Sequence, residues 1–191
     1  MRVIAGNLRS RPLAAPVGQD TRPTADRLRE TLFNILTQGA TDHVQSKAFL
    51  DLYAGSGAVG IEALSRGATH VTFVESGPPA LAILKKNLDT LNIRTGFSVE
   101  KRSVAAFLKR ETRTYNAIFL DPPYDKADEY SNTLNLLGGD GAHLLAADAI
   151  VIAEHRKKQP LAEQYGNLTR IRTLAQGDAA LSLYSVVVTG L

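Results

Sequence analysis

The sequence predicts a single α/β fold in which helices flank a mostly parallel sheet that closes with an antiparallel hairpin. Three observations predict this fold. Short apolar runs alternate with helical periodicity between residues 48 and 153. The first of these runs leads into a G-x-G-x-x-G turn at residues 55–60. Two further apolar runs near the end of the chain flank residues 176–178, Gln-Gly-Asp, which are typical of a hairpin and not of a helical crossover.

The composition excludes several classes of protein. A chain of 191 residues with 44% apolar and 21% charged residues is long enough for a full core and is not a disordered chain. The absence of Cys excludes disulfides, thiolate metal sites and cysteine nucleophiles, and it fits a reducing compartment. No apolar run approaches the roughly 18 residues of a membrane span, and the start lacks the apolar stretch of a signal peptide. We therefore expect a soluble, cytoplasmic protein.

The net charge of +3 is unevenly placed along the chain. Residues 1–36 hold six Arg and three acidic residues, whereas the other 155 residues hold 16 basic and 16 acidic residues. Arginine binds phosphate through two N–H groups and stacks on bases, so the first segment is a candidate RNA contact. Because basic and acidic residues balance in the rest of the chain, we expect no second basic surface there. If residues 1–36 do not contact RNA, residues 156–158 are the next candidate for that contact. An ordinary solvated surface remains the alternative for the whole segment.

The first 40 residues predict an extension to the α/β fold. Residues 2–5 and 11–15 form a short hairpin around Gly6-Asn7 in this interpretation. A helix then opens at residues 22–24, with Thr24 as its N-cap, and ends near Gly39. Its apolar face is carried by residues 28, 32, 35 and 36, which recur at helical spacing.

The alternating part of the chain predicts five strands joined by four helices. The expected strands are residues 48–52, 70–75, 97–101, 116–120 and 149–153, and the expected helices are residues 58–66, 78–91, 104–109 and 128–137. Strands connected through helices pair in parallel with right-handed crossovers. Residues 168–174 and 181–188 then predict the two strands of the closing hairpin, at least one of them antiparallel to its neighbour.

The glycine-rich turn has an acidic residue on either side of it. Asp51 ends the first strand, and Glu75 follows Gly55 by 20 residues, at the end of the second strand, where a carboxylate can bind both hydroxyls of a ribose. A tight turn without a ligand is the alternative. A dinucleotide would place its pyrophosphate at the start of the next helix, where Asp51 would oppose it. S-adenosylmethionine instead carries a cationic amino group and a sulfonium, which Asp51 suits.

A second motif, Asp121-Pro122-Pro123-Tyr124, directly follows the fourth strand. The two prolines stop the strand and remove two N–H donors, so the carboxylate and carbonyl acceptors dominate there. An aromatic ring stands beside them, as needed to bind and stack a planar base that carries an amino group. A rigid turn with Tyr124 as an apolar cover is the structural alternative.

These motifs resemble the RsmD family of bacterial 16S ribosomal RNA guanine-N2 methyltransferases. Residues 51–57 are similar to motif I, and Asp-Pro-Pro-Tyr is similar to motif IV, of amino-group N-methyltransferases. The other matching stretches are Arg22-Pro23-Thr24-x-Asp26-Arg27-x-Arg29-Glu30-x-Leu32-Phe33-Asn34, Leu64-Ser65-Arg66-Gly67-Ala68 and Phe73-Val74-Glu75. The resemblance extends from about residue 2 to residue 188, and Arg-Pro-Thr is its most specific element.

The resemblance implies a Rossmann-like class I S-adenosylmethionine-dependent methyltransferase with a seven-stranded sheet. Residues 1–40 would be an RNA-contacting extension, and residues 41–191 the methyltransferase domain. The expected catalytic residues are Asp121, Pro122, Pro123 and Tyr124. The expected cofactor residues are Asp51, Tyr53, Ala54, Gly55, Ser56, Gly57, Glu75, Ser76, Ser103 and Val104. The expected RNA contacts are Arg9, Arg11, Arg22, Thr24 and Arg27. Ser103 departs from the family pattern, since many methyltransferases have an acidic residue there to bind the adenine amino group.

We expect direct methyl transfer from the sulfonium to the exocyclic N2 of a guanine. Acceptors at Asp121 and Pro122 would orient the amine and stabilise the charge that develops on it. No metal is expected, because the four His show no ligand spacing. The expected partner is 16S rRNA, within an assembling small subunit, with the enzyme acting as a monomer away from membranes. The alternatives are an adenine-N6 methyltransferase on DNA or RNA, an NAD-dependent oxidoreductase, and a non-catalytic RNA-binding module.

Overall fold

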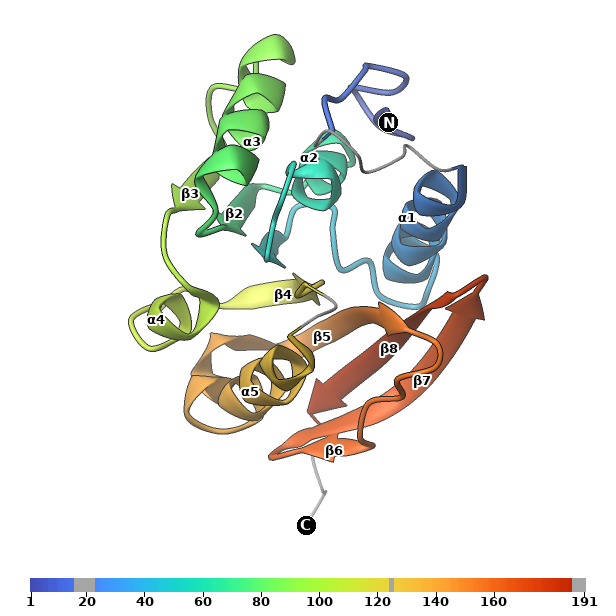
Figure 1. The fold of residues 1–191 in the computed structure, drawn as a ribbon, viewed down its shortest axis with the longest axis vertical. Coiled ribbons are helices and arrows are strands. Elements are labelled where there is room, and N and C mark those ends of the chain that lie inside the picture. Colours follow the sequence, from blue (N-terminus) through green and yellow to red (C-terminus); the bar gives the residue numbers. More distant parts are fainter. Residues whose placement is uncertain (16–22, 124–125, 187–191) are drawn as a thin grey trace.

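A computed structural model describes residues 1–15, 23–123 and 126–186, with the backbone alone for residues 23–25. It contains one eight-stranded sheet with the order β3-β2-β1-β4-β5-β8-β7-β6 (Figure 1). The strands are β1 Ala48–Leu52, β2 His70–Val74, β3 Phe97–Glu100, β4 Tyr115–Leu120, β5 Leu145–Arg156, β6 Gln164–Tyr165, β7 Leu168–Gln176 and β8 Ala179–Val186. The helices are α1 Pro23–Thr37, α2 Ala58–Ser65, α3 Pro78–Thr90, α4 Val104–Leu108, α5 Ala127–Gly138 and the 3-10 helix η1 Asp140–Leu144.

Strands β1 to β5 pair in parallel, and β8 joins β5 in the antiparallel direction. Each parallel neighbour is reached through a helix, as the alternating pattern predicts. Strands β7 and β8 form the closing hairpin, which confirms the predicted antiparallel end of the sheet. The predicted α/β class is therefore confirmed, although the two-residue β6 adds an eighth strand to the seven expected.

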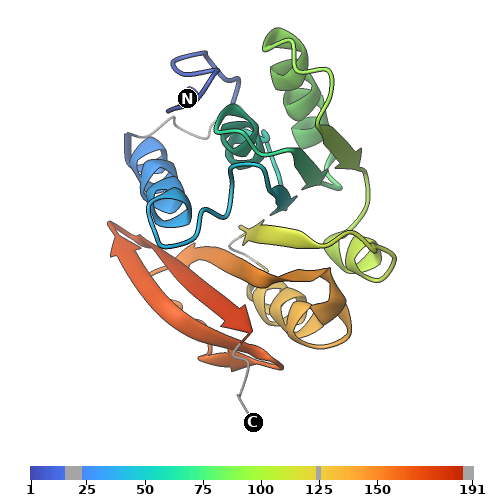
Figure 2. The same ribbon diagram turned by 180° about the vertical axis from the view of Figure 1, so that it is seen from behind.

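Helices cover both faces of the sheet (Figures 1 and 2). On one face α1, α2 and α3 pack with Phe49, Phe73 and Phe119 of the sheet. On the other face α4 and α5 pack with Leu50 and Leu120. Successive residues of a strand point to opposite faces, so Phe49 and Leu50 belong to different clusters. This three-layer arrangement leaves the carboxyl edge of the parallel strands between the two helical layers, where open α/β sheets bind their ligands.

The N-terminal segment packs on the same face as α1 and α2. Val3 and Leu13 are buried in one cluster with Leu28, Leu32 and the sheet. Carboxylate oxygens of Glu62, on α2, accept hydrogen bonds from the N–H groups of Ile4 at 2.7 Å and Ala5 at 2.9 Å. The extension and the sheet thus share one core.

The N-terminal prediction is confirmed only in part. The two arms of the hairpin pair in the antiparallel direction through backbone hydrogen bonds, such as those from the Val3 N–H to Arg11 at 2.9 Å and from the Leu13 N–H to Met1 at 3.0 Å, but they form one bridge, between Arg2 and Pro12, and no regular strands. The chain between them folds back on α2 through hydrogen bonds to Ser65. Helix α1 begins at Pro23, so Thr24 lies within its first turn and is not the N-cap. Proline suits this first helical position because its missing N–H would have no partner within the helix.

The remaining boundaries agree within four residues, and residues 187–188 of the last predicted strand lie outside the described residues. Strand β5 starts at Leu145, ahead of the predicted residue 149, because residues 145–148 extend the strand past a bulge opposite β4. Helix η1 and strand β6 were not predicted. Among the described residues, no helix is long and apolar enough to cross a membrane.

Candidate active site

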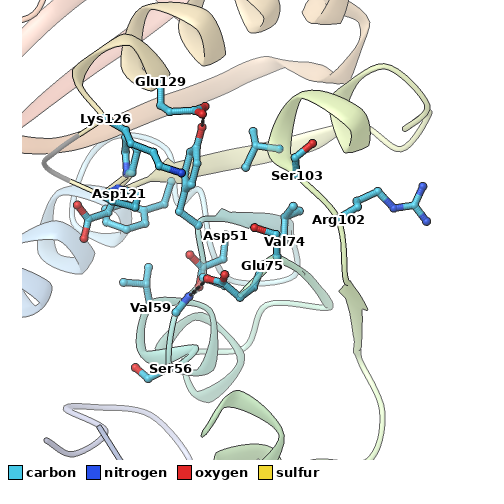
Figure 3. Close-up of a pocket in the computed structure, with 18 of the residues that line it drawn as sticks. Asp51, Ser56, Val59, Val74, Glu75, Arg102, Ser103, Asp121, Lys126 and Glu129 are labelled. Carbon is cyan, nitrogen blue, oxygen red and sulfur yellow. Dashed lines mark hydrogen bonds between the residues drawn. The ribbon is translucent and has the colours of Figure 1, made fainter. Parts of the chain in front are cut away.

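A cleft of about 850 Å³ opens at the carboxyl ends of β1, β2 and β4 (Figure 3). Its lining includes nine of the ten predicted cofactor residues, Gly57 excepted, together with Asp121, Pro122 and Pro123. The sheet pairing explains why these residues meet. Leu52 pairs with Val74 and with Leu120, and Leu120 pairs with Ala153. The residues that directly follow this row, Tyr53, Glu75, Asp121 and Glu154, therefore share one level at the carboxyl edge.

Asp51 lies at the base of the cleft and is almost fully buried. One of its carboxylate oxygens accepts a hydrogen bond from the Gly60 N–H of α2 at 2.8 Å. Removal from water, with a smaller contribution from the negative Glu75, raises the pKa of Asp51 to about 8. No ion pair to Asp51 forms within the part of the chain that the structure describes. A buried carboxylate without a cation beside it fits a cationic ligand group.

Glu75 fixes the shape of the glycine turn. Its two carboxylate oxygens accept hydrogen bonds from the N–H groups of Gly55 at 2.9 Å and Gly77 at 2.7 Å. Each oxygen retains a second lone pair that can accept a hydrogen bond from a ligand hydroxyl. Figure 3 shows Glu75 next to Asp51 in the cleft. The two carboxylates thus face one ligand-sized space.

Gly60 brings α2 close to the sheet, and Gly57 brings the glycine turn close to α3. A Cβ atom on Gly60 would lie 2.3 Å from the Phe73 ring, and one on Gly57 would lie 2.2 Å from a Leu84 methyl group. Gly57 also has a positive φ of 78°, which side chains disfavour. These two glycines allow the close packing predicted for the motif, while Gly55 (φ 56°) lines the cleft itself.

Asn87 of α3 connects the glycine turn to the N-terminal segment. Its side chain is buried, and its amide nitrogen donates to the carbonyl oxygens of Ser56 at 2.9 Å and Ala14 at 3.1 Å. Its amide oxygen accepts from the Ala14 N–H at 2.7 Å. This link between distant segments was not predicted from the sequence.

Asp121 and Pro122 stand at the end of β4, as predicted. Burial, together with the negative charges of Glu154 and Asp51, raises the pKa of Asp121 well above its usual range. Glu154 was not predicted as a site residue. It follows β5's Ala153 in the row next to Asp121, and burial raises its pKa to about 7 against the opposing charge of Arg29. Tyr124, the fourth residue of the motif, lies outside the described residues.

Other predicted cofactor residues have local structural roles. The Ser103 hydroxyl accepts a hydrogen bond from the Ala106 N–H at 3.3 Å and so caps α4. The Tyr53 hydroxyl donates to Glu129 at 2.9 Å and is within 2.7 Å of the Thr133 hydroxyl. The cleft lining also includes residues that were not predicted as cofactor or catalytic residues: Ala58, Val59, Val74, Arg102, Ala105, Phe119, Lys126, Glu129 and Arg156, the last of which belongs to the second candidate RNA contact.

The predicted RNA contacts are only partly described. Arg9, Arg11 and Arg27 are exposed, and Arg11 donates to the Thr90 carbonyl at 3.4 Å. Arg22 and the side chain of Thr24 lie outside the described residues. Arg29, which the charge count included, is buried. It donates to the Arg2 carbonyl at 2.6 Å and to Asp26 at 3.0 Å, so its charge belongs to the packing of the extension.

Comparison with known proteins places the chain among methyltransferases. A family model described as Conserved hypothetical protein 95 matches residues 1–185. The chain is 38% identical to the putative rRNA methyltransferase YlbH of Bacillus subtilis, covering 96% of this chain and 98% of that protein. It is 36% identical to the ribosomal RNA small subunit methyltransferase D of Escherichia coli K12, covering 96% of this chain and 89% of that protein. The solved structure of the putative methyltransferase yhhF from Escherichia coli superposes with a TM-score of 0.81 at 34% identity, covering 96% of each chain.

Proposed function

Since the chain belongs to the RsmD family of methyltransferases, we propose that it transfers a methyl group from S-adenosylmethionine to the exocyclic N2 of a guanine in 16S rRNA. The placement of Glu75 and Asp121 on either side of Tyr53 in one row, beside Asp51, carries this proposal, because it joins a nucleoside site to an acceptor-rich site in one cleft. We also propose that the protein acts as a cytoplasmic monomer and meets its target in an assembling small ribosomal subunit.

S-adenosylmethionine is the cofactor of this class I fold, and it supplies an electrophilic methyl group on a sulfonium. Three features of the cleft support its placement. Asp51 provides a buried negative charge for the amino group, and Glu75 provides acceptors for the ribose hydroxyls. Ser103 and Val104 line the same cleft beyond Glu75, on the side where we place the adenine.

The structure also argues against a dinucleotide in this cleft. A pyrophosphate would have to bind near the first N–H groups of α2. The Gly60 N–H there already donates to the buried Asp51 carboxyl group and so is not free to bind a phosphate. The oxidoreductase alternative therefore requires an unfavourable contact that the methyltransferase does not.

Asp121 and Pro122 would bind the target amine. Pro122 has no N–H, so its backbone offers only a carbonyl acceptor. In this proposal Asp121 and Pro122 would hold the amine with its lone pair directed at the methyl group that the cofactor would supply. The methylated nitrogen would then have to give up a proton. Asp121 in its ionised form is the group suited to receive that proton, because its raised pKa makes it a stronger base than an ordinary carboxylate.

The test is transfer of a labelled methyl group to RNA. The purified protein is incubated with labelled S-adenosylmethionine and with 16S rRNA or small subunits from a strain that lacks the homologous enzyme. Mass spectrometry of the digested nucleosides should find N2-methylguanosine, and Asp121→Ala should abolish it. N6-methyladenosine in place of N2-methylguanosine would establish the adenine alternative, and no labelled nucleoside with either substrate would refute the proposal.

A further inference from the structure

A second cavity of about 600 Å³ lies beside the cofactor cleft, between the end of β3 and α4. We call its four cationic lining residues the α4 basic surface: Lys101, Arg102, Lys109 and Arg110. The cavity shares Arg102, Ser103 and Ala105 with the cleft, so the two are continuous. Its remaining lining residue is Ala106, and no large apolar side chain lines it.

The segment that contains the α4 basic surface carries a net positive charge as large as that of the whole chain. Residues 100–113 hold five basic and two acidic residues, a net charge of +3. Once this segment and residues 1–36 are set aside, the other 141 residues hold 11 basic and 14 acidic residues. The chain therefore has two basic segments on an otherwise slightly acidic protein. The expectation of a single basic segment is wrong. The positive charge of residues 100–113 is hidden in the total for residues 37–191, because the rest of that range is slightly acidic.

The cations of the α4 basic surface are available to a partner. Lys101, Lys109 and Arg110 are exposed, and none forms an ion pair within the described ranges of the chain. Arg102 pairs with Glu100 at 2.9 Å, and Figure 3 shows its guanidinium extending away from Asp51 and Glu75. The Ser103 hydroxyl caps the start of α4 and so fixes the junction between the helix and the loop that carries Lys101 and Arg102.

The two basic segments lie on opposite faces of the sheet. The N-terminal segment packs in the cluster with α2, whereas α4 packs in the cluster with α5. Figures 1 and 2 show α4 and the N-terminal segment well separated, on either side of the sheet. The carboxyl edge with its cleft lies between α4 and the start of α1, since Arg29 of α1 is close enough to Glu154 at that edge to oppose the rise of its pKa. A long polyanion that crosses this edge can contact both segments at once.

We propose that the α4 basic surface binds the phosphodiester backbone of the substrate RNA, as a second contact separate from residues 1–36. This proposal rests on the proposed function and extends it from the target base to the flanking RNA. Repeated phosphates match several separated cations, and each contact releases counterions from the RNA. A protein partner would need apolar or aromatic anchors at the centre of its contact, and the cavity has none.

The experiment compares two double variants that each remove two exposed lysines. Lys101→Ala/Lys109→Ala changes the α4 basic surface, and Lys85→Ala/Lys86→Ala on α3 is the matched control. Binding to protein-free 16S rRNA is measured over a range of salt concentrations. Loss of two phosphate contacts should lower the slope of log affinity against log salt by about 1.4 to 1.8 in the first variant only. Lys101→Arg/Lys109→Arg should keep the parent slope.

Cofactor affinity by calorimetry and the melting temperature should match the parent in all variants, because neither lysine lines the cofactor cleft. Equal slopes for the two alanine variants would overturn the proposal. A loss of binding that is seen only with intact small subunits would also overturn the proposal, because it would indicate a protein partner. A slope difference combined with no methylation of either 16S rRNA or small subunits by the parent would refute the proposed function and leave the α4 basic surface as an RNA contact.

Discussion

The buried Asp51 predicts that cofactor binding depends on pH. Its pKa of about 8 means that much of the free protein carries a proton on Asp51 at neutral pH. A cationic amino group can pair only with the ionised carboxylate, so the proton must leave when S-adenosylmethionine binds. Binding should therefore strengthen as the pH rises toward 8 and release a proton at lower pH.

The size of the effect follows from the pKa. The apparent dissociation constant is multiplied by the ratio of total to ionised protein. For a pKa of about 8, this factor is about 2 at pH 8, about 10 at pH 7 and about 100 at pH 6. A carboxylate with an ordinary pKa near 4 would give a factor close to 1 over the whole range.

Titration calorimetry between pH 6 and 8 measures the affinity, and buffers of different ionisation enthalpy report the proton release. Methylthioadenosine is the matched ligand, because it has the nucleoside and sulfur but lacks the cationic amino group of the methionine part, and its affinity should not change with pH. Asp51→Asn should bind S-adenosylmethionine weakly and without this pH dependence. A flat affinity for the parent protein, or an equal slope with methylthioadenosine, would refute the assignment of Asp51 to the amino group.

Three further predictions concern packing, the pH optimum and RNA. Gly60→Ala should destabilise the protein by about 1–3 kcal/mol, measured by urea unfolding, because its methyl group would overlap the Phe73 ring; unchanged stability would contradict the packing role. Glu154→Gln should shift the acidic limb of the kcat/KM profile to lower pH, since it removes a negative charge that raises the pKa of Asp121; an unmoved limb would remove Glu154 from this role. Replacing Arg9, Arg11 and Arg27 together with alanine should lower RNA affinity and its salt dependence but keep cofactor affinity. A parent-like salt slope would indicate that residues 1–36 are an ordinary solvated surface.

The sheet could be predicted because its strands carry local signals. Strand β1, for example, is a short apolar run that ends at a glycine turn, and its predicted and observed bounds are the same. Strand β6 could not be predicted, because two residues contain no periodicity and depend on pairing with β7.

The site could be predicted where its residues lie at the end of a strand that the sequence also predicts. The glycine turn, Glu75 and the Asp-Pro-Pro motif each follow a predicted strand. Glu154 was missed because its place beside Asp121 depends on the register between β4 and β5. The burial of Arg29 was missed for a related reason, since its partners Arg2 and Glu62 come from other segments.

The hydrogen bonds of Asn87 have a consequence for how the protein can be dissected. Its one buried amide holds both Ala14 and the Ser56 carbonyl of the glycine turn. Deleting residues 1–15 would leave this amide with unsatisfied groups, at a cost of about 1–3 kcal/mol, and would loosen a wall of the cofactor cleft. The N-terminal segment is thus not a detachable module, and a truncated chain that fails on RNA would not identify which of its two sites was lost. Only side-chain substitutions on its exposed surface can separate the binding of RNA from the binding of cofactor.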